Sequence, residues 1–146
     1  HDPAVMSVLQ DPQGPLQMVQ PVVEEAMAKG GPRAAMAAFA GVAAGESLRL
    51  LPGSVIDRMF GNAEVFFGLE FGTFESWRPE DDRLRALSVP VHPLAGEQSP
   101  PFLHEAASWL AQQVQNDVVG VPGGHIGFVD HTDDFAGVVR RLARSE

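Results

Sequence analysis

The sequence contains no cysteine and no tyrosine among its 146 residues. The absence of cysteine excludes a disulfide framework, a cysteine nucleophile and zinc sites with thiolate ligands. It fits a reducing compartment, so we expect a cytoplasmic protein. The absence of tyrosine means that no phenol can serve as an acid or base.

Long apolar runs and positive charge are also scarce. No apolar run approaches the roughly 20 residues that a membrane helix needs, and the first residues lack the basic segment and apolar stretch of a secretory signal. The formal net charge is −9, whereas nucleic-acid binding needs a basic face. We therefore expect a globular chain with neither nucleic acid nor a membrane as its partner.

Apolar residues recur at helical spacing through the first half of the chain. One helix is predicted over residues 15–29, where Gly30-Gly31 would end it, and Pro32 would open the next. Further helical patterns run to Phe71. These helices are rich in alanine, methionine and phenylalanine, which fits either a core of packed helices or a cap that lines an apolar substrate pocket.

The second half of the chain has a different pattern, in which short apolar runs typical of strands alternate with helical segments. Residues 89–95 and 117–121 are predicted strands, and between them lies a helix that Ser99 would cap and that would begin at Pro100. A last helix ends in a group of arginines. A helical crossover between two strands implies that they pair in parallel. We divide the chain into a helical region, residues 1–87, and a strand–helix–strand–helix region, residues 88–146.

Three segments resemble the α/β-hydrolase superfamily, in the order that this fold requires. They are His1-Asp2-Pro3-Ala4-Val5, the run Val89-Pro90-Val91-His92-Pro93-Leu94-Ala95-Gly96-Glu97, and the run Val118-Val119-Gly120-Val121-Pro122-Gly123-Gly124-His125-Ile126-Gly127-Phe128. They resemble the turn after the sixth strand, the seventh strand with its exit, and the eighth strand with the histidine loop. The resemblance implies an α/β fold class: the C-terminal part of an α/β-hydrolase, with a helical cap followed by strand–helix–strand–helix with parallel strands.

The resemblance also implies a catalytic pair. His125 would be general base and then general acid. The position after the seventh strand where an aspartate is common holds Ser99, but some superfamily members, including certain haloalkane dehalogenases, place the acid after the sixth strand, where Asp2 stands here. We prefer Asp2 as the acid and keep Glu97 as the alternative. Asp2 could instead be a solvated residue at the chain end.

The nucleophile elbow of the superfamily, Gly-x-Ser-x-Gly, is absent. We therefore expect the C-terminal portion of a serine hydrolase that acts on a small ester, inactive alone and partnered by the N-terminal half of the fold or by a second copy. The alternatives are a non-catalytic module that binds an apolar small molecule and a dehalogenase-like hydrolase. We expect no cofactor and no metal, because His131 and Asp130 lack a third ligand.

Overall fold

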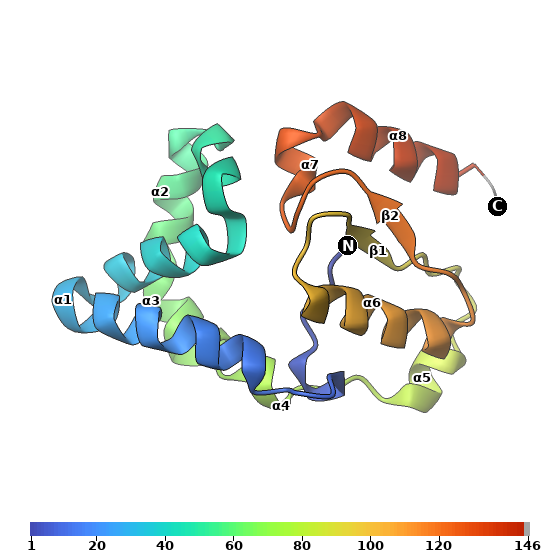
Figure 1. Ribbon diagram of the computed structural model, residues 1–146, viewed down its shortest axis with the longest axis horizontal. Coiled ribbons are helices and arrows are strands. Elements are labelled where there is room, and N and C mark those ends of the chain that lie inside the picture. The colour runs from blue at the N-terminus through green and yellow to red at the C-terminus, as the bar shows by residue number, and fades with distance from the viewer. Residues whose placement is uncertain (145–146) are drawn as a thin grey trace.

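The computed structural model describes residues 1–144, which form two lobes joined by short connections (Figure 1). The first contains α1 (Gly14–Ala44), α2 (Gly53–Gly61), α3 (Ala63–Val65) and α4 (Thr73–Ser76), with a 3-10 helix at Gly45–Leu50 and a π-helix at Phe66–Glu70. We call it the helical lobe. The second contains α5 (Asp81–Arg85), β1 (Leu94–Gly96), α6 (Pro101–Val114), β2 (Val119–Val121), α7 (Gly127–Asp130) and α8 (Thr132–Leu142). We call it the sheet lobe.

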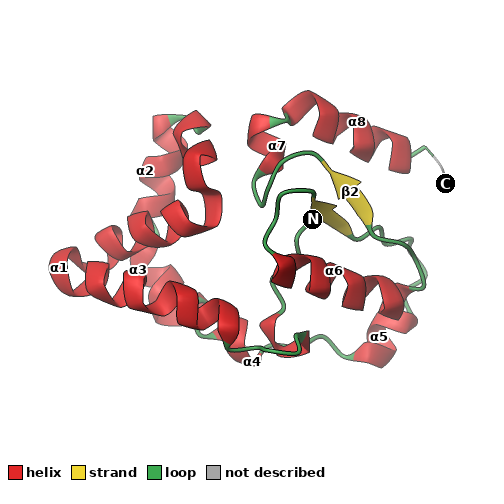
Figure 2. Cartoon of the chain, in the orientation of Figure 1, coloured by secondary structure: helices red, strands yellow, loops and turns green. Residues whose placement is uncertain are grey.

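The structure corrects the expected fold class. Helices account for 66% of the chain and strands for 4%, so the chain is mostly helical and is not an α/β-hydrolase-like α/β fold (Figure 2). In residues 1–144 the only sheet is the pair β1–β2. The two strands do run parallel, with Leu94 opposite Val119 and Gly96 opposite Val121.

Both strands are shorter than the sequence pattern predicts, and proline accounts for much of the difference. Pro90 and Pro93 interrupt the expected strand 89–95. Proline has no N–H to give to a neighbouring strand, so regular pairing begins only at Leu94. The other strand ends at Val121, before Pro122, as expected, but begins two residues later than expected, at Val119. A predicted run of β-prone residues thus yields three paired positions on each strand.

The two helices expected on either side of Gly30-Gly31 form one kinked helix, α1. Gly30 has φ −147° and Gly31 has φ +70°, so the backbone leaves helical geometry at both positions. A positive φ is easily reached only by glycine, and Pro32 cannot donate the next backbone hydrogen bond. The glycine pair therefore bends the chain and lets helical structure resume at once.

The sheet lies between two helices of the sheet lobe. On one side, Val138 of α8 packs in a buried cluster with Leu94 and Val121. On the other side, α6 lies beside β1 and buries the apolar stripe that the sequence predicts, including Leu103, Ala106, Ala107 and Ala111. Figure 1 shows α6 and α8 on opposite sides of the strands.

The beginning of the chain belongs to the sheet lobe in space. A 3-10 helix at Met6–Val8 packs on α6, where Met6 and Leu9 form a buried cluster with Ala106. The backbone N–H of Gln10 also donates to Oε1 of Glu105, 2.6 Å away. This packing anchors residues 1–9 and brings the start of the chain beside β1 (Figure 1).

Within residues 1–144, none of the helices is both long enough and apolar enough to cross a membrane.

Candidate functional site

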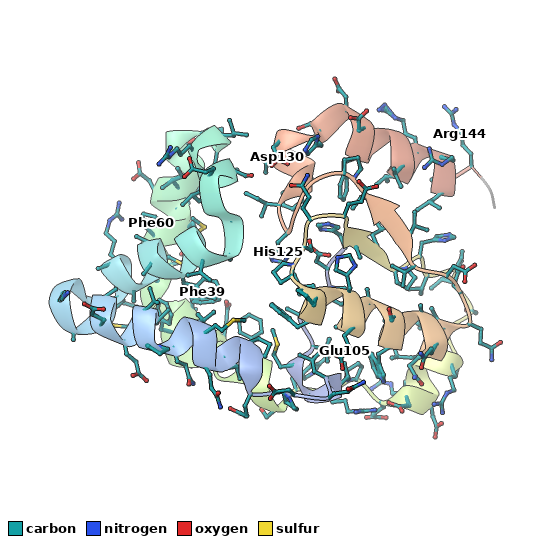
Figure 3. All side chains as sticks on the ribbon, viewed as in Figure 1. Phe39, Phe60, Glu105, His125, Asp130 and Arg144 are labelled. Atoms are coloured by element: carbon teal, nitrogen blue, oxygen red, sulfur yellow. The ribbon has the colours of Figure 1, made fainter. Side chains whose placement is uncertain are left out.

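A glycine turn after β2 carries His125 to the space between the lobes. Gly123 has φ +84°, and a Cβ atom there would lie 2.7 Å from the ring of His131 and 2.8 Å from Cα of Gly127. The carbonyl of Gly123 accepts a hydrogen bond from the N–H of Gln98 at 2.9 Å. The turn is therefore compact and tied to the exit of β1, so that the loop holds His125 in a defined place (Figure 3).

Asp2 is fixed against the outer edge of β1. Its backbone N–H donates to the carbonyl oxygen of Leu94 at 2.8 Å, and its side chain is fully buried. Its φ is +45°, an uncommon conformation for a residue with a side chain. Such strain is often found at functional sites. Asp2 is thus a buried residue rather than a solvated one at the chain end.

The carboxylate of Asp2 gathers donors from three places in the sheet lobe. Its Oδ1 accepts the backbone N–H of Gly96 at 3.0 Å. Its Oδ2 accepts the hydroxyl of Ser99 at 2.6 Å and lies 3.3 Å from Nδ1 of His125. Residues that are 123 positions apart in the sequence are therefore joined in one hydrogen-bonded group.

This arrangement sets the orientation of the imidazole of His125. A carboxylate can only accept hydrogen bonds, so Nδ1 must be the donor to Asp2, which leaves Nε2 as the acceptor in the neutral ring. The side chain of His125 is 36% exposed, whereas that of Asp2 is not exposed at all. A half-exposed imidazole with a buried carboxylate behind it can take a proton at Nε2 and release it again.

The structure corrects the capping role expected for Ser99 and bears on the choice between Asp2 and Glu97 as the acid. Ser99 is not the cap of α6, because Pro100 occupies the N-cap position without a side-chain cap bond and the hydroxyl of Ser99 is committed to Asp2. Glu97 is exposed, and its side chain lies over Gly120 of β2. Within residues 1–144 no hydrogen bond or ion pair joins Glu97 to His125, so the structure favours Asp2 over Glu97 as its partner.

Sequence reasoning missed His1 as a member of this group. Its Nε2 lies 3.5 Å from Oδ2 of Asp2. Its ring stacks at 19° on that of His125, with 6.4 Å between centroids, and meets Phe135 edge-on at 5.1 Å. The signal was present in the His-Asp-Pro start of the chain, but that motif alone does not say that the histidine packs beside the second imidazole.

Gly96 should be essential to this packing, and we expect Gly96→Ala to lower the free energy of unfolding by about 1–3 kcal/mol. A Cβ atom at Gly96 would lie 2.5 Å from Oγ of Ser99 and 2.7 Å from the carbonyl oxygen of Gly124. The matched control is Gly41→Ala in α1, where a Cβ atom meets nothing within 4 Å; there we expect a gain of about 0.5–1 kcal/mol. Urea denaturation measures both, and equal effects would contradict the packing described.

An apolar cavity of about 150 Å³ lies between the lobes, with His125 in its wall. Leu16 and Phe39 of α1 line it from the helical lobe, and Phe102 and Leu103 of α6 line it from the sheet lobe. Figure 3 places Phe39 and His125 on either side of the space between the lobes. A hydrogen bond of 2.5 Å from Ser47 to Asp130 also joins the lobes. Among the described residues that line this cavity, none carries a hydroxyl, thiol or carboxylate.

The other polar groups of the described residues do not form a second candidate site. In the part of the chain that the structure describes, no group of three or more histidine, aspartate or glutamate residues could hold a metal ion. Nδ1 of His92 lies 3.2 Å from the side-chain nitrogen of Asn116, at the surface of the sheet lobe. The chemistry is therefore concentrated at His125, Asp2 and the cavity.

No protein-family model matches the sequence, and no similar curated protein is found. The site has to be interpreted from its own geometry.

Proposed function

We propose that this chain supplies the general base and its orienting carboxylate to a hydrolase that cleaves a small ester, and that the nucleophile comes from polypeptide outside residues 1–146. The observation that carries the proposal is the buried carboxylate of Asp2 beside Nδ1 of His125, together with the apolar cavity that His125 lines. The resemblance of three segments to α/β-hydrolases agrees with it. That resemblance concerns motifs and their order, while the chain as a whole is mostly helical.

The chemistry follows from this geometry. Nε2 of His125 takes the proton of an attacking hydroxyl as the C–O bond to the carbonyl carbon forms, and Asp2 stabilises the resulting imidazolium. The same proton then passes to the departing alkoxide when its bond to carbon breaks. In the second half of the cycle, His125 takes a proton from water, hydroxide attacks the acyl group, and the original hydroxyl is restored.

The location of the nucleophile rests on two observations. The sequence contains no Gly-x-Ser-x-Gly turn, and His125 is the only polar residue among those described around the cavity. Ser99 is buried and donates its hydroxyl to Asp2. A serine elsewhere in a longer polypeptide, or on a partner polypeptide, would complete the site. The cytoplasmic location expected from the composition stays a prediction.

This predicts that a polypeptide of residues 1–146 alone does not hydrolyse p-nitrophenyl butyrate above background, because a triad without its nucleophile keeps only residual catalysis. The full-length gene product should hydrolyse the ester and react with a fluorophosphonate probe. Mass spectrometry should then place the label on a serine outside residues 1–146. Turnover by the isolated chain that disappears in His125→Ala, or a label on Ser99, would refute the assignment.

A second candidate is a non-catalytic module that binds an apolar small molecule. The observation that favours it is the same cavity, since no described residue in its lining could serve as a nucleophile. The two candidates differ in the full-length protein: a binding module would bind an apolar ligand at this cavity and would show neither ester hydrolysis nor labelling by the fluorophosphonate.

A further inference from the structure

We infer that the cavity beside His125 selects an uncharged, apolar group of about six carbon atoms next to the reacting carbonyl. The inference rests on the proposed function for the identity of the reacting group, while the size and polarity of the ligand follow from the cavity alone. It narrows the substrate from a small ester in general to a neutral ester with a medium-length aliphatic or phenyl substituent.

The apolar lining of the cavity indicates that the ligand is uncharged. Apart from His125, every residue that lines the cavity has an apolar side chain, drawn from alanine, valine, leucine, methionine, proline and phenylalanine. Among the described residues that line the cavity there is no lysine or arginine to meet a carboxylate, and no aspartate or glutamate to meet an ammonium. Burying an ionised group without a partner is very costly. A substrate with a charge at the far end of this group should therefore bind more weakly than an uncharged one.

The volume of the cavity limits the size of the apolar group that the ligand can place in it. The cavity holds about 150 Å³, and an apolar cavity of that size accommodates one benzene molecule. The ligand should therefore bring roughly six carbon atoms into it. Each buried methylene adds about 0.8 kcal/mol, which is about fourfold in affinity, until the cavity is full. Affinity should rise steeply with chain length and then level off.

The position of His125 determines how the ligand is oriented in the cavity. His125 is the one polar residue among those described in the wall of the cavity, and its Nδ1 is turned towards Asp2. The carbonyl of the ligand should therefore lie at His125, with the apolar group extending towards the aromatic side chains of the helical lobe. Phe39 and Phe71 pack edge to face there, with 5.7 Å between ring centroids. Aromatic walls of this kind suit an aliphatic chain or a phenyl ring.

Methyl ketones test the inference without chemistry, because they carry the carbonyl and the chain but cannot be hydrolysed. Binding to the full-length protein is followed by NMR shifts of the methyl groups of Leu16 and Leu103. Affinity should rise about fourfold per methylene from 2-butanone to 2-heptanone and change little at 2-nonanone. The anion 6-oxoheptanoate, in which a carboxylate replaces the terminal methyl of 2-heptanone, should bind at least tenfold more weakly.

A matched pair of variants locates the binding site. Val19 of α1 lines the cavity, whereas Val22 on the same helix is 44% exposed and lies outside its lining. Val19→Phe fills the cavity and should weaken 2-heptanone binding at least tenfold, while Val22→Phe should leave it unchanged. The chain-length series on the unaltered protein decides the question even if Val19→Phe does not fold.

The outcomes separate this inference from the proposed function. Selective ketone binding without ester hydrolysis would support the cavity inference and refute the catalytic role. Ester hydrolysis that depends on His125 but shows no preference for chain length or charge would support the catalytic role and refute the cavity inference. Equal affinity for 2-heptanone and 6-oxoheptanoate, or unaltered binding in a folded Val19→Phe variant, would overturn the inference.

Discussion

Replacing His125 with alanine in the full-length protein is expected to lower kcat for a short ester by on the order of 10³-fold or more. The loss is large because one imidazole acts twice, first accepting the proton of the nucleophile and then returning it to the leaving group. A 10³-fold loss corresponds to about 4 kcal/mol of transition-state stabilisation. Steady-state kinetics with p-nitrophenyl butyrate measures it.

His104→Ala is the matched control for this experiment. His104 lies on α6 and does not line the cavity, so its loss should leave kcat within about twofold. Thermal melting checks that both variants are folded. A folded His125→Ala enzyme with nearly normal kcat would remove His125 from the mechanism.

Replacing Asp2 with asparagine is expected to lower kcat by on the order of 10²–10⁴-fold. The amide carries no charge to stabilise the imidazolium of His125. It can also turn its NH2 group towards Nδ1, which would favour the wrong tautomer of the ring. Because Gly96 and Ser99 both donate to the carboxylate, the amide should also leave one of these donors poorly paired and lower the melting temperature.

Glu97→Gln is the control that decides which carboxylate is the acid. Glu97 lies two residues before Ser99 in the same loop, but it is exposed and lies over Gly120. Its substitution should change kcat little. If Glu97→Gln proves to be the damaging change while Asp2→Asn retains activity, Glu97 is the orienting acid.

The two residues at the centre of the site could be predicted because each lies in a local motif. His125 follows a strand and two glycines, and Asp2 lies in a short His-Asp-Pro segment. The role of Ser99 was predicted wrongly, since a serine before a proline at a helix start has the pattern of a capping residue. Its hydroxyl bonds to Asp2, 97 positions away in the sequence, and no local pattern contains that distance.

The fold class was predicted wrongly for a related reason. The β-prone composition of residues 89–95 and 117–121 indicates that strands can form, but not how many residues will find a partner. Strand length depends on neighbouring strands that accept and donate hydrogen bonds, and with Pro93 next to it the pairing here covers only Leu94–Gly96 and Val119–Val121. Resemblance of motifs therefore overstated the share of sheet.

By itself, the sequence determined what depends on near neighbours in the chain: the helical first half, the break in helical geometry at Gly30-Gly31, the parallel pairing of two short strands on either side of α6, and the glycine turn before His125. Only the tertiary structure decided what depends on distant residues meeting. It buried Asp2 against β1, turned Ser99 and His1 towards its carboxylate, left Glu97 outside this group, and formed an apolar cavity between the lobes. The physical reason is that helix periodicity and turn geometry are set within a few residues, whereas burial and hydrogen bonding between residues about a hundred positions apart arise only when distant segments of the chain pack together.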